Sequence, residues 1–371
     1  MSRAKLVRNL LAWFAGHARA LPWRSTSDPY AIWVSEIMLQ QTQVKTVLRY
    51  WPRWMRELPD VKALARAKPE RIHKLWEGLG YYTRVRNLQE AARSILEQHG
   101  GEFPKDYSAV LALRGVGRYT AGAICSIAFN QPIPVLDGNV IRVLTRVFGI
   151  GGAPRAGKTN SRLWQLAEDL VKCAAQIEGR SNILPRSRSR TNHISRRCSA
   201  FNQSLMELGA LICTPKQPQC GICPIAEHCF AHREDRIREF PNLERRLPAS
   251  PRHFAAFVVQ NGSRFLVGQR PAGVVNAHLW EFPNLEIRNG ARDLTAAAKQ
   301  VLGAAPGVLE PLFTIKHSIT RYRITLEVFR IRKRLASGSL RANVCWLRKG
   351  QLRRLPFASA HRKILERLAI R

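Results

Sequence analysis

The amino-acid sequence predicts two folded domains, an all-helical one followed by a small α+β one. A chain of 371 residues is long enough to bury two separate cores. Apolar residues recur at helical spacing before residue 250, with no strand signal, whereas alternating apolar runs begin after it. Residues 231–250 form a charged linker. We therefore expect a helical domain over residues 1–230 and an α+β domain over residues 251–371.

The net charge indicates a polyanionic partner. The chain has 60 Lys and Arg residues against 26 Asp and Glu residues, a formal charge of +34. This excess favours nucleic acid first and a membrane surface second. The membrane is the weaker alternative because no apolar run reaches the ~20 residues of a spanning helix. We expect a monomer in the cytoplasm, associated with the nucleoid if the source is bacterial.

The first expected helix is amphipathic rather than a secretory leader, because Leu6, Leu10 and Phe14 fall on one face. The sequence Leu-Pro-Trp-Arg at residues 21–24 breaks it. The helices expected next in the same domain cover residues 30–50, 51–56, 61–67, 69–76, 84–99, 120–129, 160–177 and 200–212.

The second domain begins with a predicted β-hairpin. Apolar runs at 254–260 and 263–267 flank Asn261-Gly262, a pair typical of a two-residue hairpin turn. Residues 320–331 alternate apolar and polar side chains and predict a further strand. Helices expected at about 292–302 and 359–370 complete the domain.

A glycine turn precedes the helix predicted over residues 120–129. Gly115 and Gly117 permit a tight turn and leave the amide groups of the next helix uncovered, which suits a phosphate. Asp137 follows twenty residues after Gly117. Its carboxylate could act on a nucleotide held at the turn, or it could cap the helix that follows it.

Glu36 is the second candidate acid. It lies in the middle of an apolar and amide-rich stretch of the helix expected over residues 30–50. Two interpretations are open: a solvated surface glutamate, or a buried one. Burial would raise the pKa of its carboxyl group, which suits a general acid near neutral pH.

Four of the eight cysteines form a compact metal-binding motif. Cys213, Cys220, Cys223 and Cys229 are separated by six, two and five residues. Zinc more often uses two paired CxxC motifs, or cysteine with histidine, so the spacing favours a four-iron four-sulfur cluster. The remaining four cysteines are expected to be buried or incidental thiols.

Two further segments carry groups suited to nucleic acid, and each has a structural alternative. Residues 180–198 contain six arginines and no acid, which predicts a disordered basic loop that adds phosphate attraction. Tyr81 and Tyr82 follow the glycines of a turn. They either pack internally or stack on bases.

Together these motifs resemble the helix–hairpin–helix DNA glycosylases that carry an iron–sulfur cluster, and among them the MutY-type adenine DNA glycosylases. The resemblance covers nearly the whole chain. It rests on the motifs SEIMLQQTQV (35–44), WEGLGYYTRVRNL (76–88), LRGVGRYTAGAI (113–124), VLDGNVIRV (135–143) and FNQSLMELGALICT (201–214), and on the four-cysteine loop.

The resemblance implies a reaction and a role for each matching residue. Glu36 would protonate a ring nitrogen of adenine, and Asp137 would stabilise or trap the oxocarbenium-like sugar. Tyr119 and Asn139 would orient these groups. Tyr119 stands where the bifunctional endonuclease III-like enzymes have a Schiff-base lysine. Because tyrosine cannot form an imine, a monofunctional glycosylase is implied.

The family also implies the groups that contact DNA. Trp23, Arg24 and Gln203 match residues on the adenine side of the site. Leu39, Gln41 and Tyr81 match residues that enter the base stack beside the opposing lesion. The implied partner is double-stranded DNA with an 8-oxoguanine:adenine mispair.

The second domain resembles the MutT-like Nudix module that reads oxidised guanine, through Trp280-Glu281-Phe282-Pro283. The catalytic glutamates of Nudix hydrolases are replaced near Ala297, Gln300 and Val301, so hydrolysis by this domain is not expected. The lesion-reading loop corresponds to residues 317–321, where Ser318 and Thr320 keep hydroxyl groups.

Two other functions remain as alternatives. One is an endonuclease III-like glycosylase and lyase that acts on oxidised pyrimidines. The other is a DNA-binding protein that has lost catalysis. Tyr119 argues against the first, and the presence of both Glu36 and Asp137 argues against the second.

Overall fold

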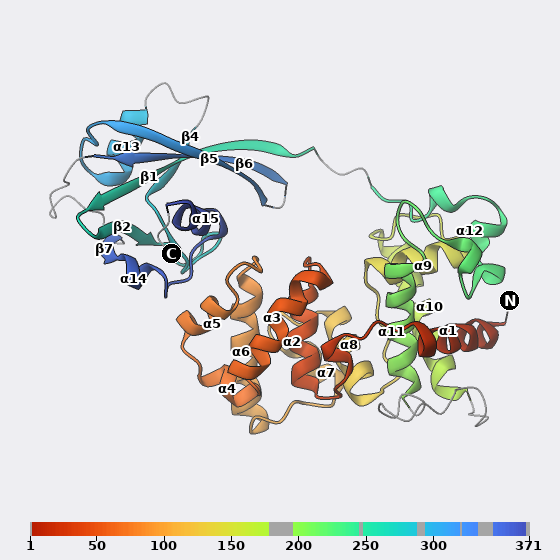
Figure 1. Ribbon diagram of the computed structural model, residues 1–371. Helices are drawn as coiled ribbons and strands as arrows, with labels where there is room; N and C mark the ends of the chain where they lie inside the picture. The colour runs from red at the N-terminus through yellow and green to blue at the C-terminus, as the bar shows by residue number, and fades with distance from the viewer. Residues whose placement is uncertain are drawn as a thin grey trace. The chain divides into compact units, whose positions relative to one another are not determined.

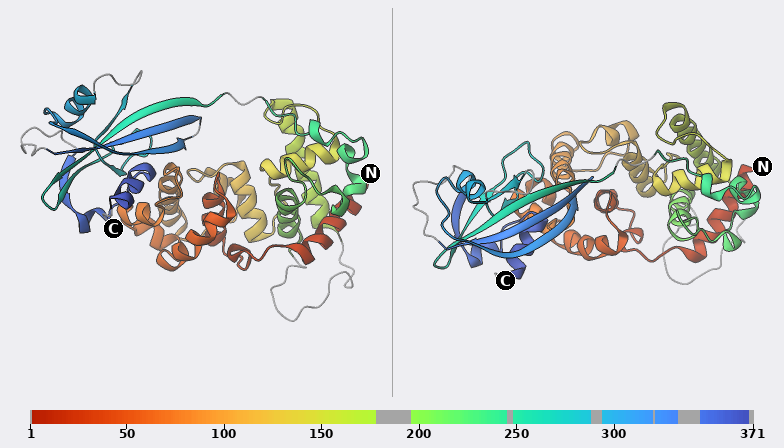
Figure 2. Two further views of the ribbon diagram at one scale, coloured as in Figure 1. Left: turned by 45° about the horizontal axis from the view of Figure 1, so that its top comes forward. Right: turned by 90° about the horizontal axis from the view of Figure 1, so that it is seen from above.

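The protein consists of two compact units (Figure 1, Figure 2). Met1–Arg66 and Asn87–Arg245 form the first unit, and Ala67–Arg86 and Arg246–Arg371 form the second. The computed structural model describes residues 2–177, 196–244, 248–287, 294–319, 321–332 and 344–368.

The described part of the first unit is helical and contains no strand, as the sequence predicts. Short polar turns and 3₁₀ segments such as Pro22–Arg24 join the helices. The α-helices are α1 (Arg3–His17), α2 (Pro29–Leu39), α3 (Val44–Glu57), α4 (Val61–Arg66), most of α6 (Thr83–His99), α7 (Tyr107–Ala112), α8 (Arg118–Phe129), α9 (Gly138–Phe148), α10 (Gly157–Gln176), α11 (Arg197–Leu211) and α12 (Phe230–Arg233).

The predicted amphipathic first helix is confirmed as α1, which buries Leu6, Leu10 and Phe14. The single helix predicted over residues 30–50 is wrong. Asp28 caps α2 through hydrogen bonds to two backbone amides, and α2 then stops at Leu39. Gln41 adopts a left-handed backbone with φ 55°, which redirects the chain before α3 begins.

The boundary predicted between residues 50 and 51 does not exist, because α3 continues through Pro52. The hydrophobic period does not reveal the one left-handed residue that breaks the helix. Pro52 lies inside α3 without ending the helix.

The helix–turn–helix around the glycines is formed by α7 and α8. Asp106 caps α7, and Gly117 is the N-cap residue of α8. Asn130, in a left-handed conformation, ends α8 two residues before Pro132. The chain then runs extended along α8, so close that a side-chain carbon on Gly122 would lie 2.2 Å from the carbonyl oxygen of Pro134. This close approach brings Asp137 to the start of α9.

Helix α11 packs against α1, α8, α9 and α10 and so forms the centre of the rest of the unit. It begins at Arg197, three residues earlier than predicted, and Cys198 is buried in it. The C-terminal boundary predicted for the basic insert over 180–198 is therefore wrong, because its last two residues belong to α11. The part of the insert from 180 to 195 lies outside the described residues.

The second unit is a mixed sheet with helices on both faces. The strand order is β3-β2-β1-β6-β5, with β4 also pairing with β1 and β7 with β2. Only the β1–β6 pair is parallel among the described strands. The strands are β1 (Ser250–Asn261), β2 (Arg264–Gln269), β3 (Trp280–Glu281), β4 (Asn284–Ile287), β5 (Leu309–Ile319), β6 (Tyr322–Ile331) and β7 (Val344–Arg348).

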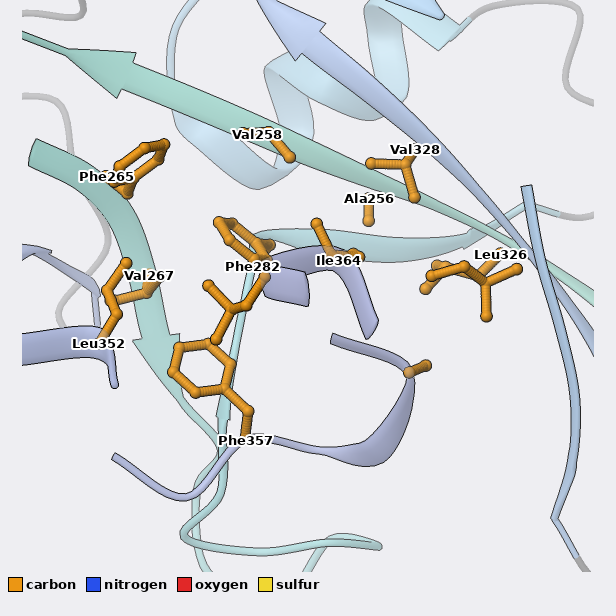
Figure 3. Packing of buried hydrophobic residues seen from close by; sticks show 13 residues of the cluster. Ala256, Val258, Phe265, Val267, Phe282, Leu326, Val328, Leu352, Phe357 and Ile364 are labelled. Atoms are coloured by element: carbon orange, nitrogen blue, oxygen red, sulfur yellow. The ribbon is translucent and has the colours of Figure 1, made fainter. Parts of the chain in front are cut away.

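Alternate residues of β1 enter two separate hydrophobic clusters. Ala256 and Val258 face one cluster, which contains α15 (Ser359–Arg367) and is drawn in Figure 3. Ala255, Phe257 and Val259 face the other cluster, with α13 (Leu294–Leu302). The two-residue period of a strand is what separates the two faces. Helices α5 (Pro69–Leu75) and α14 (Lys349–Leu352) also belong to this unit.

The predicted hairpin is confirmed: β1 and β2 pair in antiparallel fashion, and Gly262 in the turn has φ 56°. The strand predicted over 320–331 is β6, and Thr320 lies outside the described residues. Strand β5 was not predicted. Its outer residues are only half buried, and its sequence lacks a clean alternation.

Among the described helices, none is both long enough and apolar enough to span a lipid bilayer.

We expect Gly122→Ala to destabilise the helical unit by about 1–3 kcal/mol, because the new methyl group overlaps the carbonyl of Pro134. Gly16→Ala in α1 is the matched control, since nothing lies within 4 Å of its added carbon. It should be neutral or stabilising by up to about 1 kcal/mol. Urea denaturation followed by helical circular dichroism measures both. Equal stability of the two variants would contradict the close approach.

Candidate active site

A cavity of about 410 Å³ opens in the first unit between α2, α8, the start of α9 and α11. Its lining includes most of the candidate site residues singled out from the sequence. Those that line it are Trp23, Arg24, Glu36, Leu39, Gln41, Tyr119, Asp137, Asn139 and Gln203. Segments far apart in the chain therefore meet at one site.

Glu36 is buried on α2, with 6% of its surface exposed. Burial raises the pKa of its carboxyl group to about 7. The hydroxyl of Tyr119, which donates to Glu36 Oε2 at 2.8 Å, lowers this pKa, and the nearby charge of Asp137 raises it. A carboxyl group that titrates near neutrality can both donate and accept a proton. Of the two interpretations, burial is the correct one.

Asp137 is both the cap of α9 and a wall of the cavity. Its Oδ1 accepts from the backbone amide of Val140 at 2.7 Å, and its Oδ2 accepts from Asn139 Nδ2 at 2.9 Å. Burial raises the pKa of Asp137, while these hydrogen bonds lower it. One side chain therefore caps α9 and also presents its carboxylate to the cavity.

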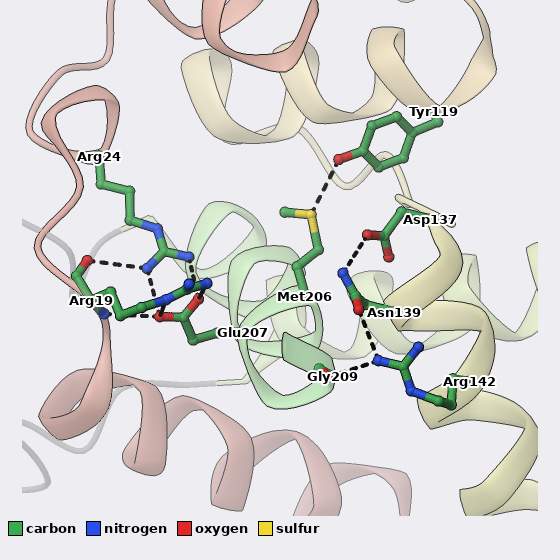
Figure 4. A network of polar contacts seen from close by, with 9 residues as sticks. All are labelled: Arg19, Arg24, Tyr119, Asp137, Asn139, Arg142, Met206, Glu207 and Gly209. Atoms are coloured by element: carbon green, nitrogen blue, oxygen red, sulfur yellow. Dashed lines mark hydrogen bonds and ion pairs between the residues drawn. The ribbon is translucent and has the colours of Figure 1, made fainter. Parts of the chain in front are cut away.

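The hydroxyl group of Tyr119, on α8, points toward Met206 on α11 (Figure 4). Its hydroxyl is 2.8 Å from Glu36 Oε2 and 3.3 Å from Met206 Sδ. Burial raises the pKa of its phenol well above the ordinary value. Tyr119 therefore stays protonated and serves as a hydrogen-bond donor to Glu36.

Asn139 is held in turn by Arg142, one helical turn further along α9 (Figure 4). Arg142 Nη2 donates to Asn139 Oδ1 at 2.8 Å and to the carbonyl oxygen of Gly209 at 2.7 Å. Its Nε donates to the carbonyl oxygen of Cys213 at 2.7 Å. One buried guanidinium thus connects the cavity to the first cysteine of the metal-binding motif.

Glu207 on α11 is a cavity residue that the sequence reasoning missed. Its side chain is fully buried and accepts from Arg19 and from Arg24, with closest contacts of 2.7 and 2.8 Å. Burial alone would raise the pKa of Glu207, but these arginines hold it at about 2. The sequence does contain a signal for Glu207, because this glutamate lies within an apolar helical stretch. The same pattern identified Glu36 as a candidate.

The turn with Gly115 and Gly117 lies apart from the cavity lining. Gly115 has φ 78°, and a side-chain carbon there would lie 2.7 Å from Cβ of Asn87, so only glycine fits. Gly117 is exposed, with open space around it, at the N-terminus of α8. Exposed amide groups at the start of a twelve-residue helix suit a phosphate.

Three predicted contact residues, Tyr81, Ser318 and Thr320, belong to the second unit. Tyr81 lies in a turn, is 41% exposed and has a left-handed backbone with φ 49°. Ser318 is exposed near the end of β5, and Thr320 lies outside the described residues.

The four cysteines of the motif, Cys213, Cys220, Cys223 and Cys229, line one apolar cavity between α9, the end of α11 and their own loop. Arg146 Nη1 donates to Cys213 Sγ at 3.4 Å. Four cysteines that line one space beside a buried cation supply the donor set of a thiolate-bound cluster.

Comparison with known families assigns each part of the chain. Residues 34–169 match the HhH-GPD superfamily of base excision DNA repair proteins. Residues 213–229 match the iron–sulfur binding domain of endonuclease III, so the cysteine loop binds an iron–sulfur cluster. Residues 255–367 match the NUDIX domain.

Individual proteins resemble the chain over most of its length. An adenine DNA glycosylase of Mus musculus is 35% identical over 86% of this chain and 69% of its own length. One of Buchnera aphidicola subsp. Schizaphis graminum is 32% identical over 75% of this chain and 74% of its own. A solved thermostable thymine-DNA glycosylase covers 62% of this chain and 97% of its own, with 29% identity and a TM-score of 0.53.

We expect the carboxyl carbon of Glu36 to titrate near pH 7 in ¹³C NMR, with the signal identified by its loss in Glu36→Gln. In Tyr119→Phe the titration should move to higher pH, because the hydrogen bond from Tyr119 lowers the pKa of Glu36. Tyr107→Phe, outside the cavity, is the control. An unchanged midpoint in Tyr119→Phe would contradict the pairing.

Proposed function

This chain belongs to the adenine DNA glycosylase family and is a base-excision DNA repair glycosylase, and we propose that it hydrolyses the N-glycosidic bond of adenine paired with 8-oxoguanine or guanine. The observation that carries the proposal is the pair of carboxylates, the buried Glu36 and the partly buried Asp137, in one cavity with a tyrosine between α2 and α11. This combination supports acid-assisted hydrolysis without an imine.

Glu36 acts first as the general acid. Adenine is a poor leaving group, and it is flipped out of the duplex before reaction. Glu36 protonates a ring nitrogen, so that adenine departs as a neutral base. A pKa of about 7 leaves a useful protonated fraction near neutrality. Tyr119 holds the carboxyl group in place through its 2.8 Å hydrogen bond.

Asp137 acts on the sugar. Departure of the base leaves positive charge on the deoxyribose, and the Asp137 carboxylate stabilises or covalently traps it. Glu36, now ionised, then activates water, as in retaining glycosidases. The hydrogen bonds from Val140 and Asn139 keep Asp137 oriented during both steps.

The other cavity residues recognise the extruded adenine. Trp23 offers an aromatic face, and Gln203 and the Arg24–Glu207 pair offer donors and acceptors beside it. Buried polar groups of this kind discriminate strongly against bases that leave them unpaired.

Several groups outside the cavity position the duplex. Gly115 and Gly117 anchor a phosphate, while Leu39, Gln41 and Tyr81 fill the base stack beside the opposing base. The left-handed backbones of Gln41 and Tyr81 support this role, because such conformations concentrate at functional sites. Ser318 and Thr320 contact the oxidised guanine. The enzyme acts as a monomer.

Cys213, Cys220, Cys223 and Cys229 would hold a four-iron four-sulfur cluster. When bound, the cluster supplies iron–thiolate bonds that fix the shape of the loop after α11. Arg142 and Arg146 support that loop from α9.

One assay separates this function from the two alternatives. A duplex with one 8-oxoguanine:adenine pair is incubated with the enzyme and then treated with alkali. Strand breaks that appear only after alkali support a monofunctional adenine glycosylase. A second duplex, which contains an oxidised pyrimidine, is tested in parallel. Strand breaks in this duplex without alkali would support an endonuclease III-like lyase. Binding without any base release would leave a DNA-binding protein.

Glu36→Gln should reduce adenine release by at least about 10²–10⁴-fold, because an amide cannot deliver the proton. Affinity for the mispaired duplex should persist. Single-turnover release and gel-shift binding measure the two quantities. Glu97→Gln, on the exposed face of α6, is the control. Normal release by Glu36→Gln would rule out the role given to this residue.

The single-turnover rate should be bell-shaped in pH. It should fall roughly tenfold per pH unit as the pH rises through about 7, because the protonated form of Glu36 is lost. The acidic limb should lie above the ordinary pKa of aspartate, since burial raises the pKa of Asp137 and only its ionised form stabilises the sugar. A rate that keeps rising above pH 8 would contradict the assignment of the acid.

A further inference from the structure

Residues 67–86 are attached at several points to segments within residues 277–362 of the second unit. Lys74 Nζ donates to the carbonyl oxygen of Leu355 at 3.0 Å, and Arg86 Nη1 donates to the carbonyl oxygen of Ala277 at 3.2 Å. These contacts lie on either side of the turn that carries Tyr81.

Glu77 makes the most concentrated of these attachments. Its Oε1 accepts from the backbone amide of Phe357 at 2.9 Å. Its Oε2 accepts from Arg362 Nη1 at 3.2 Å and from Lys74 Nζ at 2.7 Å. The Glu77 side chain is only 11% exposed, so these charged contacts are poorly screened by water. Removing the carboxylate takes an acceptor from all three donors at once.

The next residues form the turn that presents Tyr81. Gly80 has φ 73° and Tyr81 has φ 49°. Trp76 Nε1 donates to the carbonyl oxygen of Gly80 at 3.1 Å, and the guanidinium of Arg84 lies 5.6 Å from the Tyr81 ring centroid. Internal contacts therefore shape the turn. Glu77, at its start, attaches that shape to Phe357 and to Arg362 on α15.

Phe357 carries the attachment into the core of the second unit. Its ring lies 6.1 Å from that of Phe282, within the cluster that also holds Ile315 and Leu326 (Figure 3). Ile315 is on β5 and Leu326 on β6, the paired strands that carry Ser318 near their turn. One packed path thus joins the Tyr81 turn to that hairpin.

We propose that Glu77 is a positioning residue that fixes the Tyr81 turn relative to the β5–β6 hairpin, and that it thereby sets selectivity for 8-oxoguanine over guanine opposite adenine. This inference rests on the proposed function, in which Tyr81 and Ser318 contact the same oxidised base. Two contacts on one base require a fixed separation between them. Glu36 and Asp137 belong to the other unit, so the shared chemistry does not depend on Glu77.

The test compares single-turnover adenine release from 8-oxoguanine:adenine and guanine:adenine duplexes. Glu77→Ala should lower the ratio of the two rates by about tenfold. The guanine:adenine rate should stay within about twofold of the wild-type rate. Glu77→Gln keeps an acceptor for the Phe357 amide but loses the charge, so its ratio should be intermediate. Glu70→Ala, an exposed acid on the preceding helix α5, should keep the wild-type ratio.

An equal fall on both duplexes would indicate a merely structural role and overturn the proposal, as would a Glu77→Ala ratio equal to that of Glu70→Ala. If Glu77→Ala does not fold, Arg362→Ala replaces it, since that side chain is 37% exposed. Arg362→Ala should also lower the ratio of the two rates. Because Arg362 and Glu77 contact each other, combining Arg362→Ala with Glu77→Gln should lower the ratio by less than the two single effects together. Wild-type enzyme that releases no adenine would defeat the proposed function itself. If the wild-type enzyme prefers the 8-oxoguanine:adenine duplex and Glu77→Ala prefers it equally, only the inference about Glu77 is wrong.

Discussion

The buried guanidinium of Arg142 is the interaction on which the arrangement of the helical unit depends. It bonds Asn139 beside the cap of α9, the carbonyl of Gly209 in α11 and the carbonyl of Cys213 at the start of the cysteine loop. Gly209 must be glycine here, because a side-chain carbon would lie 2.6 Å from Cβ of Asn139. Removing one partner of such a buried charge is costly. Cluster loop and cavity are therefore parts of one structure.

The cavity shows how the same unit tolerates charge in its interior. Glu36 is buried and has no ion-pair partner among the residues that the structure describes, and burial raises the pKa of its carboxyl group. Glu207, equally buried, is bonded to Arg19 and Arg24, and its pKa is low. The partners, not the burial, distinguish the two glutamates. One is suited to moving a proton and the other to remaining an ionised acceptor.

Much of this organisation could be predicted from local sequence patterns. The two-part fold, the hairpin at Asn261-Gly262 and the cavity lining follow from periodicity, turn chemistry and motif resemblance. The break between α2 and α3 could not, because a single left-handed residue, Gln41, leaves no trace in the hydrophobic period. Strand β5 was missed because its burial depends on pairing with β6. Glu207 was missed because its role depends on arginines nearly two hundred residues away.

The excursion of residues 67–86 into the second unit changes how the two parts can be separated. The chain crosses between units three times, not once, and only the last crossing is near residue 245. A fragment that ends at that crossing would keep α5 and the Tyr81 turn but lose the partners that Lys74, Glu77 and Arg86 have in residues 277–362. Truncation would therefore remove a domain and also release a loop in the piece that remains. Any selectivity lost by such a fragment would combine both effects.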